Sequence, residues 1–329
     1  MVFVLGMGAG VVVVVVFLLI IATMVIRRDK ATNNSSLSAP LHMYYDRNGI
    51  FLTDIKVENQ PIQVVVDTGS AHLLVSGKDC DTCLSNDGKI YPKSAPQQTG
   101  HLVQYGSQQD VVDWHRGKVS LGGHEKPDIE FAVASHRSGS SNYNILGVGR
   151  MQQGTRRCFL EHFCEGTDKQ ASPVTIELAG PRGRLWLSPD LNDHPPVQVL
   201  LPMLPPPFYR VQIAAVFVGQ TRVPSIMIPL GGLIFDSGSN MLDLPTTLYD
   251  FVRPHLDNNA KLEFRITSAT QPTQQLAITY GPKQYRWETG DLLVERGTDF
   301  QYVVLGSLFM NRMRLRFDPE HNQLGLSLL

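Results

Sequence analysis

One short unit occurs twice in this chain and constrains its fold more than any other feature. Each copy runs from an apolar strand into an acidic turn and then into a second apolar segment; the turns are Asp67-Thr68-Gly69-Ser70 and Asp236-Ser237-Gly238-Ser239. Each copy is followed by an apolar pair and a glycine, Ile145-Leu146-Gly147 and Val304-Leu305-Gly306. A glycine beside the acid lets two backbones approach closely. The duplication predicts two lobes related by a pseudo-two-fold axis that brings the two carboxylates together.

Two carboxylates at hydrogen-bonding distance can perform acid–base chemistry that neither performs alone. They share one proton, because ionising both in one site is costly, and their titrations are pushed apart. One group then acts as acid and the other as base on a water between them, which allows hydrolysis of an amide without a covalent intermediate. We expect the hydroxyls of Thr68 and Ser237 to bond across the junction and lock both turns. We expect those of Ser70 and Ser239 to donate to the outer carboxylate oxygens.

These motifs resemble those of the pepsin-like aspartic endopeptidases, and the resemblance covers about residues 40 to 329. In that family each lobe supplies one catalytic aspartate, which corresponds here to Asp67 and Asp236. A hairpin flap bearing a Tyr-Gly pair closes over the substrate, and Tyr105, Gly106 and Ser107 match it. The stretch Val303–Gly306 resembles part of the family's C-terminal signature.

The resemblance implies an all-β, bilobal fold of two β-barrel or sandwich lobes. We place the first lobe at residues 41–203 and the second at 204–329, with the cluster Pro202, Pro205, Pro206 and Pro207 at the crossing. Short apolar-alternating strands broken by Gly, Pro, Asn and Ser favour this architecture. Helices are expected only near Cys158–Phe163 and Thr246–Val252.

The activity implied by the resemblance is that of an aspartic-type endopeptidase acting on peptides or proteins, without a cofactor or a metal. Ile145 and Tyr105 are expected to line pockets beside the scissile bond, which predicts cleavage between bulky apolar residues. The alternative is a catalytically silent pepsin-like protein that only binds peptide or protein. Because both motifs lie in one chain, we expect a monomer. The net charge of −1 without a long basic run argues against a nucleic-acid partner.

The chain also departs from the family pattern at positions near the motifs. The family usually has a tryptophan seven residues after the first catalytic acid, bonded to the flap tyrosine, and here that residue is Leu74. The flap is therefore expected to be looser. The family often has an aspartate after its last Leu-Gly, where this chain has Ser307. The second lobe is short and lacks the cysteine pair that is common there.

The four cysteines form two local pairs. Cys80 and Cys83 fall where the family often closes a small loop, so a disulfide is the preferred interpretation; redox chemistry and one half of a zinc site stay open as alternatives. Cys158 and Cys164 have no clear family counterpart. If their segment is helical, residues six apart point to different faces and cannot pair directly.

The N-terminal residues differ in kind from the rest of the chain. Residues 2–26 carry no charge and are long enough to cross a bilayer as a helix, which predicts a transmembrane anchor at 1–26 and a polar tether at 27–40. A cleaved signal peptide is the alternative. Arg27, Arg28 and Lys30 favour a cytoplasmic catalytic part, whereas the glycosylation sequons at Asn33 and Asn34 are useful only in the lumen. We expect a single-pass membrane protein of the secretory or endomembrane system with a lumenal or extracellular catalytic part.

Overall fold

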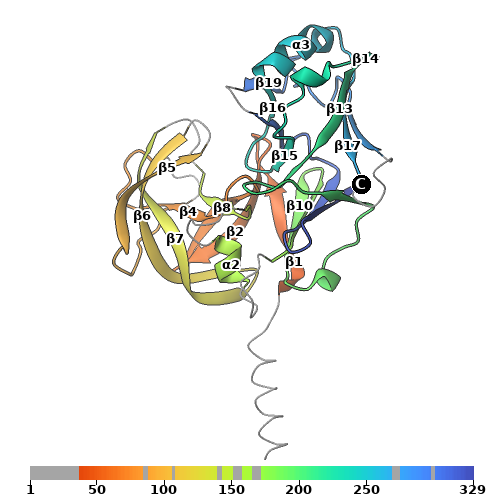
Figure 1. Ribbon diagram of the computed structural model, residues 1–329. Coiled ribbons are helices and arrows are strands. Elements are labelled where there is room, and N and C mark those ends of the chain that lie inside the picture. Colours follow the sequence, from red (N-terminus) through yellow and green to blue (C-terminus); the bar gives the residue numbers. More distant parts are fainter. Residues whose placement is uncertain are drawn as a thin grey trace, which may run out of the picture. The chain divides into compact units, whose positions relative to one another are not determined.

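The computed structural model (Figure 1) describes residues 37–83, 88–105, 108–138, 143–150, 158–164, 172–268, 275–297 and 301–329. The chain divides into two units, Met1–Leu37 and Ser38–Leu329, and the second contains every described residue except Leu37. The predicted anchor and most of the tether lie outside the described residues. Within the described ranges, no helix is long and apolar enough to cross a membrane.

The described chain is mostly β-structure, as the sequence predicts. The first half contains β1 (Leu37–Tyr45), β2 (Phe51–Val57), β3 (Gln60–Asp67), β4 (Leu73–Ser76), β5 (Gln98–Tyr105), β6 (Gln108–Leu121), β7 (His124–Ser138), β8 (Ile145–Gly147), β9 (Val174–Ala179) and β10 (Arg182–Leu187). The second half contains β11 (Val199–Pro202), β12 (Arg210–Val211), β13 (Ile213–Val218), β14 (Thr221–Arg222), β15 (Leu233–Asp236), β16 (Leu242–Pro245), β17 (Leu262–Thr267), β18 (Gln275–Tyr280), β19 (Val294–Gly297), β20 (Val303–Gly306), β21 (Met313–Asp318) and β22 (Gln323–Leu328).

The helices lie close to where the sequence predicts them. They are α2 (Phe159–Phe163) and α3 (Thr246–Asp257), and short 3-10 turns occur at Leu191–Asp193 and Ser225–Met227. Helix α3 runs beyond the predicted Val252 and contains Pro254. Its buried face, formed by Leu248, Val252 and Leu256, repeats at helical spacing, which explains why the helix continues through the proline.

The predicted duplication appears directly in the strand registers. In the first copy β3 pairs with β8 in parallel, so that Asp67 lies opposite Gly147. In the second copy β15 pairs with β20 in parallel, so that Asp236 lies opposite Gly306. The strand after each turn, β4 or β16, then pairs antiparallel with β8 or β20. Each acidic turn therefore sits at the same place in an equivalent three-strand unit.

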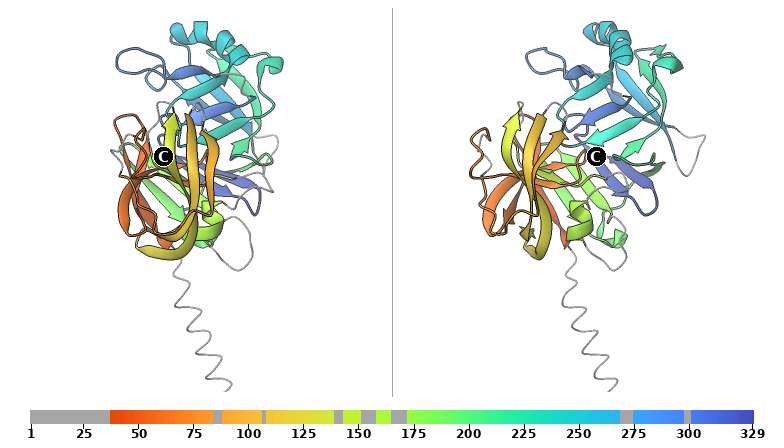
Figure 2. Two further views of the ribbon diagram at one scale, coloured as in Figure 1. Left: turned by 90° about the vertical axis from the view of Figure 1, so that its left-hand side faces the viewer. Right: turned by 60° about the vertical axis from the view of Figure 1, so that its left-hand side comes forward.

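A thirteen-stranded sheet contains strands from both halves of the sequence. Its order is β11-β22-β21-β9-β10-β1-β2-β3-β8-β4-β7-β6-β5. Strand β21 pairs with β9 along five residues, with Leu315 opposite Ile176, and Figure 2 shows these blue and green strands side by side. The other sheets, β12-β15-β20-β16-β19 and β14-β13-β17-β18, come from the second half alone. The mostly-β architecture fits the bilobal pepsin-like fold that the resemblance implies.

Candidate active site

The two acidic turns are joined by reciprocal hydrogen bonds between Thr68 and Ser237. The Thr68 hydroxyl donates to the Phe235 carbonyl at 2.7 Å and accepts from the Ser237 backbone N–H at 2.9 Å. The Ser237 hydroxyl donates to the Val66 carbonyl at 2.6 Å and accepts from the Thr68 backbone N–H at 3.1 Å. Both side chains are 1% exposed. The cross-junction bonding predicted from these two hydroxyls is present.

The same junction places the two carboxyl groups against each other. The Gly69 N–H donates to Asp67 Oδ1 at 2.7 Å, and the Gly238 N–H donates to Asp236 Oδ1 at 2.9 Å. A Cβ atom added at Gly69 would lie 2.6 Å from the Asp236 carboxyl group, and one added at Gly238 would overlap the Asp67 carboxyl group. Each carboxyl group thus rests on the glycine of the opposite turn, where any side chain would displace it.

The electrostatics of this pair favour one proton held between two groups. Burial, the nearby Asp67 charge and a hydrogen bond with Asp67 raise the pKa of Asp236 well above its ordinary value. Backbone N–H groups of Gly238 and Ser239 bond to the carboxylate and oppose that rise. Asp67 itself is 7% exposed. The arrangement holds Asp236 protonated at pH values where an exposed aspartate is ionised.

The serines that follow each glycine do not make the contacts expected of them. Ser70 Oγ is buried and has no hydrogen-bond partner among the described residues. Ser239 Oγ accepts from the Met241 N–H at 3.4 Å instead of donating to a carboxylate. Backbone N–H groups hold the Asp236 carboxylate in place of the expected hydroxyl, because the turn aims them at it. Ser307, also in this region, is fully buried, donates its hydroxyl to the Gly49 carbonyl and its N–H to the Ser239 carbonyl.

The flap residues are described only in part. Strands β5 and β6 form a hairpin in which Tyr105 lies opposite Gln108, while Gly106 and Ser107 lie outside the described residues. Leu74, at the position of the family's tryptophan, is fully buried in an apolar cluster with Val112 and Ile145. Val103 of the hairpin packs against the same cluster. The roles assigned to Tyr105, Gly106, Ser107 and Ile145 remain predictions.

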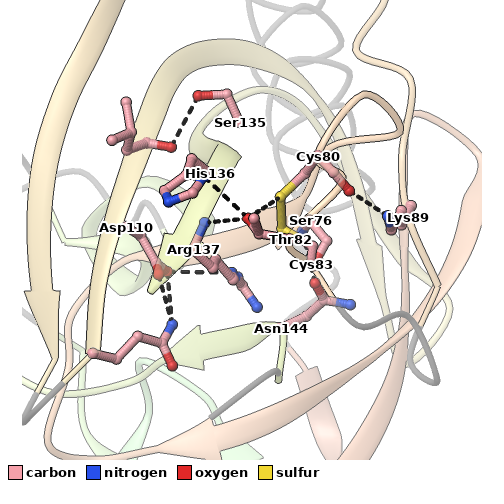
Figure 3. The surroundings of a disulfide bond; sticks show 12 residues. Ser76, Cys80, Thr82, Cys83, Lys89, Asp110, Ser135, His136, Arg137 and Asn144 are labelled. Carbon is pink, nitrogen blue, oxygen red and sulfur yellow. Dashed lines mark hydrogen bonds and ion pairs between the residues drawn. A yellow bond between two sulfur atoms is a disulfide. The ribbon is translucent and has the colours of Figure 1, made fainter. Parts of the chain in front are cut away.

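A disulfide joins Cys80 to Cys83 and confirms the preferred prediction for this pair (Figure 3). Both cysteines are buried and belong to the cluster around Leu74. Cys158 and Cys164 are not joined in a disulfide, and burial raises the pKa of Cys164 to about 12. No group of three or more His, Cys, Asp or Glu side chains in the described ranges is arranged to hold a metal ion.

Two acidic residues on the sheet that carries Asp236 were not among the residues predicted from the sequence. Cα partners in neighbouring strands present their side chains on one face, as do residues two apart in a strand. Ile234 lies two residues before Asp236 on β15. The residues opposite it on the neighbouring strands β20, β16 and β19 form a row with it on one face of the sheet: Ile234, Val304, Asp243 and Glu295. Val65 lies two residues before Asp67 on β3 and begins the equivalent row. This row runs across β3, β8, β4 and β7 and consists of Val65, Ile145, Leu74 and Ala132.

The two rows differ sharply in chemistry. All four residues of the first-lobe row are buried and apolar, whereas Asp243 is half-buried and Glu295 is exposed. Burial, and then the charge of Glu295, raise the pKa of Asp243 to about 6. The duplication itself could have revealed the pair: Asp243 follows Asp236 by seven residues (243 − 236), as Leu74 follows Asp67 (74 − 67).

Comparison with known proteins agrees with this geometry. Residues 51–164 match the model of the family described as eukaryotic aspartyl protease. The chain is 22% identical to a probable vacuolar protease A of Arthroderma benhamiae over 325 residues, covering 85% of this chain and 78% of the relative. It is also 22% identical to a vacuolar protease A of Aspergillus fumigatus over 331 residues, covering 85% of this chain and 79% of that protein. The chain is thus similar to aspartyl proteases both in the matched segment and along most of its length.

The junction gives a direct stability prediction for Thr68→Val. The substitution keeps the side-chain shape but leaves the Phe235 carbonyl and the Ser237 N–H unpaired in a buried site. We expect a loss of about 2–4 kcal/mol in the free energy of unfolding, measured by urea denaturation. Thr221→Val on the exposed strand β14 is the matched control. Equal losses in the two variants would contradict the role of the Thr68 hydroxyl.

The raised pKa of Asp236 predicts how stability depends on pH. The folded state binds this proton more tightly than the unfolded state, so the stabilisation is complete below the unfolded pKa and is lost as pH rises through the folded pKa. Asp236→Asn removes the cost of ionising this group. The variant should therefore be more stable than the wild type at neutral pH, with the difference shrinking toward strong acid. Thermal unfolding across pH tests this, with exposed Asp79→Asn as the control; a difference that does not change with pH would refute the assignment.

Proposed function

We propose that the protein is an aspartic-type endopeptidase in which Asp67 and Asp236 form the catalytic pair. The observation that carries the proposal is the contact of each carboxyl group with the glycine of the opposite turn, across the Thr68–Ser237 junction. Such a pair can share one proton and bind one water. The similarity to vacuolar protease A of two fungi supports the same class of reaction.

The raised pKa of Asp236 suggests how the two roles divide. Asp67 takes a proton from the water as the water oxygen bonds to the peptide carbonyl carbon. Asp236 gives its proton to the carbonyl oxygen, which yields a neutral tetrahedral diol. When the C–N bond breaks, the amide nitrogen takes the proton held by Asp67, one hydroxyl of the diol returns its proton to Asp236, and the carbonyl re-forms as part of a carboxylic acid. The reaction consumes one water and forms no covalent bond to the enzyme.

The two rows beside the catalytic pair suggest different preferences on the two sides of the scissile bond. The row that contains Ile145 and Leu74 is apolar and buried, so it places no charge on that side, which is compatible with the bulky apolar preference expected from the sequence. On the Asp236 side, Asp243 and Glu295 lie opposite each other in register. The neighbouring cation Arg296 bonds to Asp250 at 2.7 Å, away from this pair. A basic substrate side chain on that side would relieve the repulsion between the two acids.

The cellular setting is a separate proposal that rests on the sequence of residues 1–40. We infer that the uncharged run at 2–26 anchors the protein in a membrane of the secretory or endomembrane system, with the catalytic part lumenal or extracellular and monomeric. The disulfide between Cys80 and Cys83 supports an oxidising compartment.

The catalytic assignment predicts that Asp67→Asn and Asp236→Asn each reduce kcat by several orders of magnitude. Removing either carboxyl group leaves no shared-proton pair, so the double variant should lose little more than either single variant. Initial rates on a mixed peptide library, with thermal unfolding to confirm folding, measure this. Full activity in either single variant would exclude the mechanism, and inactivity of the folded wild type would favour the peptide-binding alternative.

The specificity proposal predicts an asymmetric cleavage profile. A peptide library should show bulky apolar residues on one side of the cut and enrichment of Lys or Arg on the other. Asp243→Leu should shift the second preference from basic to apolar, because it recreates the residue found at position 74 of the first lobe. Asp250→Asn, which affects a carboxylate paired to Arg296, serves as the control. A wild-type profile that is apolar on both sides would count against the acidic pair as a determinant.

A further inference from the structure

A charged pair is completely buried near the tip of the β5–β6 hairpin. Asp110 lies on β6, two residues after Gln108, which pairs with Tyr105 near the tip. Arg137 lies on the neighbouring strand β7, opposite Asp110 in the register. The Asp110 side chain is 0% exposed and that of Arg137 is 1% exposed, with 3.2 Å between Oδ2 and Nε. The hairpin is thus linked through this pair to the body of the first lobe.

The partners of the pair extend in both directions. Gln108 Nε2 donates to both oxygens of the Asp110 carboxylate at 2.8 Å. The Arg137 guanidinium donates through Nη1 to the Tyr143 carbonyl at 2.7 Å. The Arg137 backbone N–H donates to Thr82 Oγ1 at 2.8 Å, and Thr82 lies inside the Cys80–Cys83 loop. Figure 3 shows Asp110, Arg137 and Thr82 linked in series next to the disulfide.

Such a pair contributes more to fixing one conformation than to overall stability. Removing two charges from water costs several kcal/mol per ion, and apolar residues of similar size often serve stability as well or better. Burial raises the pKa of Asp110, while Arg137, Gln108 and His136 oppose the rise. The carboxylate therefore depends on this one geometry, which it reaches only when β6 is correctly placed against β7.

The pair also lies where the sequence predicts a weakness. Leu74 cannot make the hydrogen bond that the family's tryptophan makes to the flap tyrosine. In this chain Leu74 instead packs with Val112 of β6 and with Val103 of β5, and these apolar contacts carry no directional constraint. A directional contact on the hairpin is supplied by Gln108 and Asp110.

We propose that Asp110 and Arg137, with Gln108, are positioning residues that hold the β5–β6 hairpin in the orientation needed to close over a peptide bound at Asp67 and Asp236. The proposal rests on the proposed function for its consequence in catalysis, but not for its effect on the hairpin. Loss of the pair removes the buried side-chain link between the hairpin and β7 near the tip and leaves only backbone pairing there, while the far end of β6 and β7 keeps the ion pair of Arg116 and Asp128, 2.8 Å apart.

Three variants test the proposal on the full chain. Asp110→Asn and Arg137→Gln each remove one charge, and the double substitution Asp110→Leu with Arg137→Met replaces the pair by apolar side chains. Arg116→Gln is the matched control, because it breaks an exposed ion pair between the same two strands. The first readout is hydrogen exchange of residues 98–112 compared with β13 and β17. The second is the split between KM and kcat on a cleaved peptide.

We expect exchange in the hairpin to accelerate by about tenfold in all three variants, with β13 and β17 unchanged. KM should rise by about tenfold while kcat stays within about twofold, since the reacting groups are intact. The double variant should keep the melting temperature of the wild type and still show the mobile hairpin. If it shows wild-type exchange in the hairpin, or if exchange rises equally in β13 and β17, the pair has only a structural role and the proposal fails. If the protein has no peptidase activity, the hydrogen-exchange result alone tests the role of the pair. Failure of the proposed function is therefore distinguishable from failure of this proposal.

Discussion

The structure depends on four hydrogen bonds that the hydroxyls of Thr68 and Ser237 make across the junction. Each hydroxyl accepts a backbone N–H from the other turn and donates to a backbone carbonyl of the other copy, at residues 66 and 235. Because every donor and acceptor at this buried point is satisfied by the opposite copy, neither turn can keep its shape without the other. The position of both carboxyl groups follows from this contact, since they lie one residue away in the chain.

The parts of the fold and site that repeat in the sequence could be predicted from it. The duplicated turns predicted the Asp67–Asp236 pairing and the Thr68–Ser237 junction. Both follow from a strand-turn-strand unit that occurs twice and is related by a pseudo-two-fold axis. The hydroxyls of Ser70 and Ser239 could not be placed this way, since their contacts depend on rotamers set by packing. The Asp110–Arg137 pair was also missed, because no local pattern marks residues that meet only through sheet register.

The two acidic turns have equivalent backbone pairing but different neighbouring side chains. The backbone registers around Asp67 and Asp236 correspond residue by residue, yet one row ends in Leu74 and Ala132 and the other in Asp243 and Glu295. Differences in burial explain why the two rows carry different residues. Leu74 is enclosed by the disulfide and the hairpin strands, whereas Asp243 keeps access to solvent and so tolerates a charge. The two acidic turns therefore keep equivalent geometry while the flanking strands differ in chemistry.

The pairing of β9 with β21 has a consequence for how the molecule is assembled. The contact between Ile176 and Leu315 closes a loop of 139 residues (315 − 176), and such distant pairings are slow to form. Until β21 arrives, one edge of β9 presents unpaired N–H and C=O groups beside the buried side chains of Val174, Ile176 and Leu178. The part of the chain that ends with β10 cannot complete its own sheet, so a folding intermediate that contains only this part would expose an unpaired strand edge. Efficient production of this protein therefore depends on the late strands reaching that edge before another molecule does.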